Sequence, residues 1–313
     1  CEGLVGSEMC IRDSYNGEKD LPDLIECLRS QTYAADQVEY LLVDNNSSDR
    51  SSSIIQAAAE SRETTIHLIK ENQIQSSYAA RNVGIRAANR EILAFTDVDC
   101  RPQPQWLENL IRPFSDPNVG IVVGEILALM GESFLEKYAD KQKVLSQKHT
   151  LAHPFCPYGQ TANLAIRKQA FVEVGLFRSY LTTGGDADIC WRILRETSYQ
   201  FKFVEKAIVK HRHRSTWKDL QSQWRRYGKS NKYLHELYGV DLMRELKTKE
   251  YLYRLSRWLL KELPLTMVKV ISGKAELVEL FNTPISLLNG RARILGQKEA
   301  ILSDKARQID RLC

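Results

Sequence analysis

Two aspartates, Asp97 and Asp99, follow directly after the apolar run Ile92–Thr96. This run is short and contains an aromatic and a β-branched residue, which predicts a buried strand. A buried strand cannot carry two charges within it, so we expect both carboxylates at its carboxyl end, where open α/β sheets bind ligands. Residues i and i+2 of an extended chain point the same way, so the pair could hold one hard cation or its phosphate ligands. The alternative is an ordinary turn, which Asp also favours.

Further polar side chains lie close to the ends of other predicted strands and helices. The predicted strand Val38–Val43 runs into Asp44 and Asn45, and Arg81 lies near the start of a helix predicted for Tyr78–Ala88. The polar turn that begins at Asp44 and continues to Asp49 is rich in residues that cap helix N-termini.

A second pair of carboxylates, Asp186 and Asp188, lies near the start of the helix predicted for Asp188–Glu196. An acidic side chain there also has a structural role available, because it can cap the free backbone N–H groups of the first turn. The spacing by itself leaves both roles open.

Strands alternate with helices over the first two-thirds of the chain. Short apolar runs indicate the strands, and apolar residues at i, i+3 and i+4 indicate the helices. This alternation predicts an α/β fold with a mostly parallel sheet and helices on both faces. Beyond Ser215 the pattern predicts helices alone.

Composition is that of an ordinary soluble globular protein, with 43% hydrophobic and 27% charged residues among 313. No apolar run approaches the ~20 residues that span a bilayer. Seven cysteines without C-x-x-C spacing favour reduced thiols and a cytoplasmic location over a disulfide framework or a zinc site. From Glu205 onward, 23 Lys and Arg stand against 12 Asp and Glu. Such a basic segment indicates either a polyanionic or anionic-membrane partner or a solvated helical face.

The first fourteen residues, Cys1–Ser14, have no signal-peptide pattern and are interpreted as a non-native leader. The segment EMCIRDS resembles translated sequencing-adapter sequence, and the recognisable protein begins at Tyr15. We therefore expect the first central strand to be missing and this chain to be destabilised or inactive, because the neighbouring strands would keep unpaired backbone groups. Met9–Arg12 fits the vacant strand position poorly.

Four motifs occur in a fixed order: VDNNSSD from Val43, ARNVG from Ala80, TDVD from Thr96 and GGDADICWR from Gly184. This series resembles the family-2 glycosyltransferases, whose fold is the Rossmann-like GT-A fold. The resemblance covers Tyr15 to Ser215, about two-thirds of the chain. It implies a catalytic domain at 15–214 that binds a nucleotide-sugar, followed by a basic, aromatic-rich helical extension at 215–313.

The resemblance assigns roles at the nucleotide and the metal. Asp44 and Asn45 would lie against the base and ribose, although many relatives have Asp where this chain has Asn45. Arg81, by its alternative only a solvated residue at a helix start, would border the nucleotide pocket. Asp97 would face the ribose or a metal-bound water, and Asp99 would bind Mn²⁺ or Mg²⁺.

The basic segment Lys210–Arg214 follows the last predicted strand and contains two histidines. In relatives a His that matches His211 completes the metal shell, and neutral imidazole is a reasonable ligand for manganese. The flanking arginines would favour the diphosphate of the donor. They could also form a nucleic-acid patch, but aromatic interleaving is absent from the sequence and no nucleic-acid partner is expected.

The resemblance places the catalytic base in the last motif. The Asp that matches Asp186 would deprotonate the acceptor hydroxyl, with Asp188 as a competitor, a cap or a second acceptor contact. Gly185 stands where relatives commonly have Glu, a departure that would change acceptor contacts. Gly159 and Asn163 would line the sugar and acceptor pocket, whereas the alternative for Asn163 is to satisfy backbone groups at a strand edge.

The expected activity is inverting, metal-dependent transfer of a sugar from a UDP-, GDP- or dTDP-sugar to a hydroxyl acceptor, a glycan or a lipid-linked molecule. The basic and aromatic extension could make peripheral contact with the inner face of the membrane, or its aromatics could pack the helices onto the catalytic domain. Two rival readings are a nucleotidyltransferase and a catalytically inactive nucleotide- or glycan-binding module.

Overall fold

The computed structural model describes residues 8–61 and 64–312. Within them, one sheet has the strand order β3-β2-β1-β4-β7-β6-β8-β5. The pairs β1–β2, β1–β4, β2–β3 and β6–β8 are parallel, while β7 runs antiparallel to both of its neighbours and β5 antiparallel to β8. The strands are β1 Glu8–Ser14, β2 Val38–Asp44, β3 Ile66–Lys70, β4 Ile92–Thr96, β5 Cys100–Pro102, β6 Val119–Ala128, β7 Asn163–Arg167 and β8 Gln200–His211.

The first of these strands corrects the prediction for the start of the chain. Glu8–Ser14 pairs with β2 along its whole length and with β4 from Glu8 to Ile11, so the central strand position is filled. The prediction of a vacant position is wrong, because pairing of the backbone between two strands needs no particular side-chain pattern. The expectation of an unstable or inactive chain rested on unpaired backbone groups beside a missing strand, and these groups are paired with β1. The foreign origin of residues 1–14 stays a prediction, and residues 1–7 lie outside the described residues.

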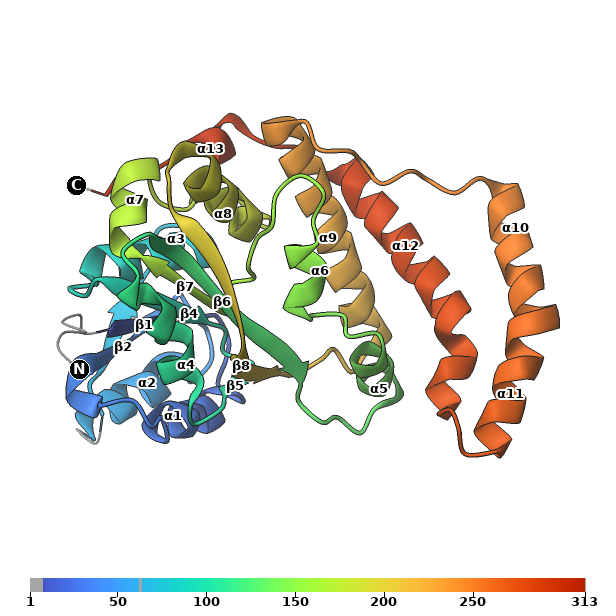
Figure 1. Cartoon of the computed structure of the whole chain (residues 1–313), viewed down its shortest axis with the longest axis horizontal. Coiled ribbons are helices and arrows are strands. Elements are labelled where there is room, and N and C mark those ends of the chain that lie inside the picture. The colour runs from blue at the N-terminus through green and yellow to red at the C-terminus, as the bar shows by residue number, and fades with distance from the viewer. Residues whose placement is uncertain (1–7, 62–63, 313) are drawn as a thin grey trace. The chain divides into compact units, whose positions relative to one another are not determined.

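Helices cover both faces of this sheet, as the sequence pattern predicts (Figure 1). On one face, α1, α2 and α4 share one apolar core with every second residue of β2, namely Val38, Tyr40 and Leu42. On the other, Phe95 of β4 packs against Phe171 and Phe177, with ring centroids 6.3 and 5.9 Å away. The helices around this sheet are α1 Leu21–Arg29, α2 Ser51–Glu60, α3 Ser77–Ala87, α4 Trp106–Ile111, α6 Gln147–Leu151, α7 Lys168–Val174, α8 Gly185–Glu196 and α13 Asp304–Arg307, with 3₁₀ turns η1 Ala35–Gln37 and η2 Arg112–Ser115.

Two compact units divide the chain, and their boundaries differ from the predicted ones. The sheet unit comprises the chain up to Leu129, Leu145–His211 and the segment from Ser303 onward. The helical unit comprises Met130–Val144 and Arg212–Leu302. The division after His211 is close to the predicted one after residue 214. The sequence analysis did not predict that Met130–Val144 belongs to the helical unit or that the segment from Ser303 belongs to the sheet unit. Membership in a packed unit depends on long-range contacts, which local periodicity does not reveal.

The helical unit is built around α9 and α12, which approach closely at two glycines. A Cβ on Gly228 would lie 1.9 Å from the carbonyl oxygen of Arg293, and one on Gly296 1.9 Å from that of Arg225. The aromatic side chain of Trp224 packs on an apolar cluster in this unit, which favours the packing role over a membrane role for that residue. Its elements are α5 Phe134–Lys141, α9 Trp217–Tyr238, α10 Thr248–Arg257, the π-helical segment η3 Trp258–Glu262, α11 Leu263–Ile271, η4 Leu277–Phe281 and α12 Asn282–Glu299.

Candidate active site

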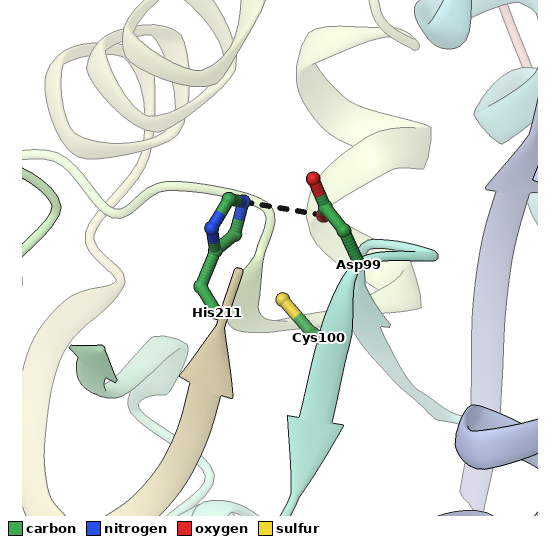
Figure 2. Close-up of side chains that lie close together, drawn as sticks. All are labelled: Asp99, Cys100 and His211. Atoms are coloured by element: carbon green, nitrogen blue, oxygen red, sulfur yellow. Dashed lines mark ion pairs between the residues drawn. The ribbon is translucent and has the colours of Figure 1, made fainter. Parts of the chain in front are cut away.

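The metal-ligating side chains predicted from sequence meet beside the carboxyl end of β4. The Nε2 atom of His211 lies 3.1 Å from Oδ1 of Asp99. The register explains this meeting, because β5 begins at Cys100, directly after Asp99, and Cys100 pairs with His211 across the antiparallel β5–β8 ladder. Figure 2 shows the carboxylate and the imidazole pointing toward each other, with the thiol of Cys100 beside them.

One ligand atom from each of Asp99, Cys100 and His211 lies within 4.8 Å of the others. A carboxylate oxygen and an imidazole nitrogen suit Mn²⁺, and the carboxylate also suits Mg²⁺. The donor set therefore fits the predicted cation. The thiol of Cys100 was not predicted from sequence, because only the β5–β8 register places it there. Its Sγ lies 3.8 Å from the carbonyl oxygen of Ala162, to which the neutral thiol donates.

Asp97 does not join this group of ligand atoms. Its Oδ1 accepts a hydrogen bond of 3.0 Å from Nη2 of Arg81, whose Nη1 lies 3.9 Å from Oδ1 of Asp186. The Arg81 guanidinium is buried and lies over the ring of Tyr78, 5.4 Å from its centroid. Arg81 thus joins two carboxylates from distant parts of the sequence and offsets their mutual repulsion.

Asp186 has the surroundings of a proton acceptor. Thr161 donates to it twice, from Oγ1 at 3.1 Å and from the backbone N–H at 3.4 Å, and 24% of its side chain stays exposed. Burial raises the pKa of Asp186 above its usual range, the charge of Arg81 acts in the opposite direction, and Asp97 raises it further. A carboxylate with a raised pKa is a stronger base, and the exposed part leaves it accessible to a substrate.

Asp188 does not share this environment, although it is only two residues away. Its side chain is fully buried and forms ion pairs with Arg178 at 2.9 Å and Arg192 at 2.9 Å. Both carboxylate oxygens are used, one for each arginine. Helical geometry turns Asp188 away from Asp186 and into the protein interior, a position that does not support the predicted roles of base, cap or acceptor contact.

Gly185 is packed against Tyr78, a residue that the sequence analysis did not select. A Cβ at Gly185 would lie 2.6 Å from Cζ of the Tyr78 ring, and the Tyr78 hydroxyl accepts a hydrogen bond of 2.9 Å from the Gly185 backbone N–H. The preceding Gly184 has a left-handed φ of 84°, which suits glycine. The absence of a side chain at position 185 thus makes room for Tyr78, and a direct acceptor contact by Gly185 is not supported.

Two further predicted contacts with the sugar have structural roles instead. Asn163 is fully buried and donates to the carbonyl oxygens of Glu125 and Ala207, while its own Oδ1 accepts from Trp106. A Cβ on Gly159 would lie 2.0 Å from Cγ1 of Val123, so this glycine permits close packing of the core. Asn163 thus has the alternative role, that of satisfying backbone groups, and the packing of neither residue supports the predicted sugar or acceptor contact.

Asp44 and Asn45 lie at the end of β2, two places from β4 in the strand order. The side-chain nitrogen of Asn45 donates to the carbonyl oxygens of Glu71 and Ile74, so it fastens the neighbouring loop and has no donor left for a base. Oδ1 of Asp44 accepts from the backbone N–H of Ser47 at 3.3 Å. A nucleotide contact stays a prediction for Asp44, whereas the amide donors of Asn45 are used within the protein.

A mixed sheet of this strand order, covered by helices on both faces, is the fold of the GT-A glycosyltransferases. The sequence profile of "Glycosyl transferase family 2" matches residues 11–180. The chain belongs to this family and is a glycosyltransferase.

Named relatives agree with this assignment. Glycosyltransferase AglE of Haloferax volcanii is 32% identical over 67% of this chain and 68% of its own length. The mannosyltransferase PcManGT from Pyrobaculum calidifontis, solved with GDP-Man and Mn²⁺, has a TM-score of 0.63 at 18% identity and covers 94% of this chain and 88% of its own. Glucosyl-3-phosphoglycerate synthase from Mycobacterium tuberculosis, solved with Mn²⁺, UDP-Glc and phosphoglyceric acid, has a TM-score of 0.56 at 15% identity and covers 76% and 81%. These structures share the fold of this chain.

Proposed function

We propose that this glycosyltransferase is inverting and depends on a divalent cation, and that Asp186 is its catalytic base. The observation that carries the proposal is the triad Asp97–Arg81–Asp186, in which a partly exposed carboxylate with a raised pKa is held by Thr161 and Arg81. The arrangement supplies a base of fixed orientation.

The donor would be a nucleoside-diphosphate sugar, as in the solved neighbours that contain GDP-Man or UDP-Glc. Asp99 and His211 would hold Mn²⁺ or Mg²⁺ against the diphosphate, with Cys100 beside them. When bound, the cation neutralises charge that develops on the departing nucleoside diphosphate. Asp44 would contact the nucleotide from the end of β2.

The transfer is a single displacement in this proposal. The acceptor oxygen forms a bond to the anomeric carbon, the bond from that carbon to the diphosphate oxygen breaks, and the hydroxyl proton moves to Asp186. A base opposite the leaving group gives inversion at the anomeric carbon. The positive charge of Arg81 favours the ionised form of Asp186 and so opposes the effect of burial on its pKa.

The first test is isothermal titration calorimetry of UDP, GDP and dTDP, each with and without Mn²⁺, on the wild-type chain and Asp99→Ala. We expect one nucleotide to bind in a metal-dependent manner, with the heat lost in the variant. Asp36→Ala provides a matched control, since Asp36 is an exposed aspartate of η1 outside the site. Metal-independent binding, or full binding by Asp99→Ala, would exclude the assigned cation site.

The stereochemical part of the proposal has its own test. Once the donor is known, ¹H NMR of the first product formed from an α-linked donor sugar should show a β-anomeric coupling. An α-anomeric product would contradict the single displacement and the role of Asp186 as base.

A further inference from the structure

Three helical segments of the helical unit, α10, η3 and α11, follow one another without a break from Thr248 to Ile271 (Figure 1). None of their residues is buried. The stretch is held at its π-helical segment, where Nε1 of Trp258 donates to the carbonyl oxygen of Leu280 at 2.8 Å and Oγ1 of Thr283 donates to Glu262 at 2.5 Å. We call this stretch the helical rod.

The rod and the turn after it hold half of the exposed large apolar side chains in the described part of the chain, eleven of twenty-two. Leu260 and Ile271 are exposed by 77% and 83%. Single exposed apolar residues are normal on a protein surface, but so many within one short stretch of chain indicate an interaction surface. The members of the group are Leu252, Tyr253, Leu255, Leu259, Leu260, Leu265, Met267, Val268, Ile271, Leu277 and Phe281.

Apolar and basic side chains occupy different faces of α10. Leu252 and Leu255 follow the i, i+3 spacing and therefore lie along one face, whereas Arg254 and Arg257 point to another. A helix with an apolar face and a basic face matches the interface between the acyl chains and the headgroups of a lipid bilayer.

Charge identifies the partner. From Lys247 to Lys274 there are seven Lys and Arg but two acidic residues, Glu250 and Glu262. Both acidic residues are already paired, with Arg244 at 2.6 Å and with Arg257 at 2.9 Å. This net positive charge suits anionic phospholipid headgroups, to which juxtamembrane Lys and Arg are attracted. A second copy of the chain would bring two positively charged surfaces together.

We infer that the helical rod rests on an anionic membrane surface, with its leucines at the acyl boundary and its Lys and Arg among the headgroups. No helix in the described residues is long and apolar enough to cross a membrane. This inference does not depend on the proposed base or cation, and vesicle binding can be measured without any donor sugar. It goes beyond catalysis by placing the enzyme at a surface where a lipid-linked hydroxyl acceptor would be found.

The test is co-sedimentation of the full chain with phosphatidylcholine vesicles and with mixed phosphatidylcholine–phosphatidylglycerol vesicles at rising salt. We expect binding to the mixed vesicles that weakens with salt. Charge reversal in Lys261→Glu/Lys269→Glu should weaken it about tenfold or more. Removal of two apolar anchors in Leu260→Ser/Ile271→Ser should also weaken it about tenfold or more.

Val172→Ser is the matched control, since Val172 is an apolar residue of α7 with 45% exposure and lies in the sheet unit. It should bind vesicles as the wild type does, and all variants should keep the wild-type melting temperature because the changed side chains are exposed. Equal binding to both kinds of vesicle, or unchanged binding by the two double variants, would overturn the inference. A dimer in size-exclusion chromatography with light scattering that Leu260→Ser/Ile271→Ser dissociates would assign the surface to a second copy instead.

Discussion

The chain contains two Asp-X-Asp triplets, one after β4 and one in the first turn of α8, and they use the same spacing differently. In the triplet after β4, both carboxylates stay partly exposed, and each meets a cationic or imidazole partner of the site, Arg81 for Asp97 and His211 for Asp99. In the helical triplet, Asp186 is partly exposed and Asp188 is fully buried between two arginines.

The difference follows from backbone geometry. Val98 and Asp99 lie in a turn after β4, closed by the Cys100 N–H donating to the carbonyl oxygen of Asp97. In a helix of 3.6 residues per turn, by contrast, an i, i+2 pair is separated by about 200° around the axis. The helical triplet therefore divides into a partly exposed residue, the proposed base Asp186, and a buried residue, Asp188, that holds the protein together. The same substitution made at each of the two aspartates can therefore distinguish a role in catalysis from a role in stability.

The largest effect is expected from Asp186→Asn. Loss of the base should lower kcat by a factor of about 10² to 10⁴. The raised pKa of Asp186 means that the folded state favours the neutral carboxyl. Its ionisation therefore reduces stability as pH rises from the unfolded-state pKa through the folded-state pKa, and Asn should keep or raise the melting temperature at neutral pH. Steady-state kinetics and thermal unfolding measure both results.

Asp188→Asn is the matched change two residues away and should act on stability. One partner of a buried ion-pair network is lost while Arg178 and Arg192 keep their charge, a change that costs about 3–5 kcal/mol of unfolding free energy. Urea unfolding of the two Asn variants side by side gives the comparison. An Asp188→Asn variant that is as stable as the wild type but inactive would restore Asp188 as a candidate base.

A smaller, pH-dependent effect is expected from Arg81→Gln. Because Arg81 lowers the pKa of Asp186, its removal should move that pKa further upward. The acid limb of the kcat profile should then shift to higher pH, with activity partly recovered in alkaline buffer. An acid limb at the wild-type position would show that Asp186 is not the group that titrates.

The sequence predicted the fold well where a single local rule applies. Short apolar runs that alternate with segments of helical periodicity predicted the sheet and its helices. The two aspartates that follow Ile92–Thr96 predicted where β4 ends. It also paired Asp99 with His211, although 112 positions separate them, because the family resemblance supplied that link.

Residues whose roles depend on three-dimensional contacts were not predictable in the same way. Asn163 and Gly159 appear in a pocket motif, but whether such residues face a ligand or the core depends on neighbours such as Trp106 and Val123. Tyr78 carried no signal at all, since its hydroxyl reaches a backbone N–H that lies 107 positions away. The central strand β1 was rejected on side-chain pattern, whereas its pairing is a property of the backbone.

The smallest predicted effect concerns Tyr78, which joins the start of α3 to the start of α8. Tyr78→Phe keeps the ring against Gly185 and beneath Arg81 but removes the acceptor for the Gly185 N–H. One net hydrogen bond contributes about 1 kcal/mol, so we expect kcat to fall by about fivefold if the bond orients the turn that carries Asp186. The KM for the donor should stay unchanged, because Asp99 and His211 are untouched.

The matched partner of this change is Gly185→Ala, whose Cβ would overlap the Tyr78 ring. This variant should lower kcat more than Tyr78→Phe does, since the ring or the helix start must move. The double variant Tyr78→Ala/Gly185→Ala removes the overlap and should recover part of that loss relative to Gly185→Ala. If Gly185→Ala lowered kcat and the double variant showed no recovery, the loss would arise from the backbone of α8. The first turn of that helix would then orient Asp186 without help from α3.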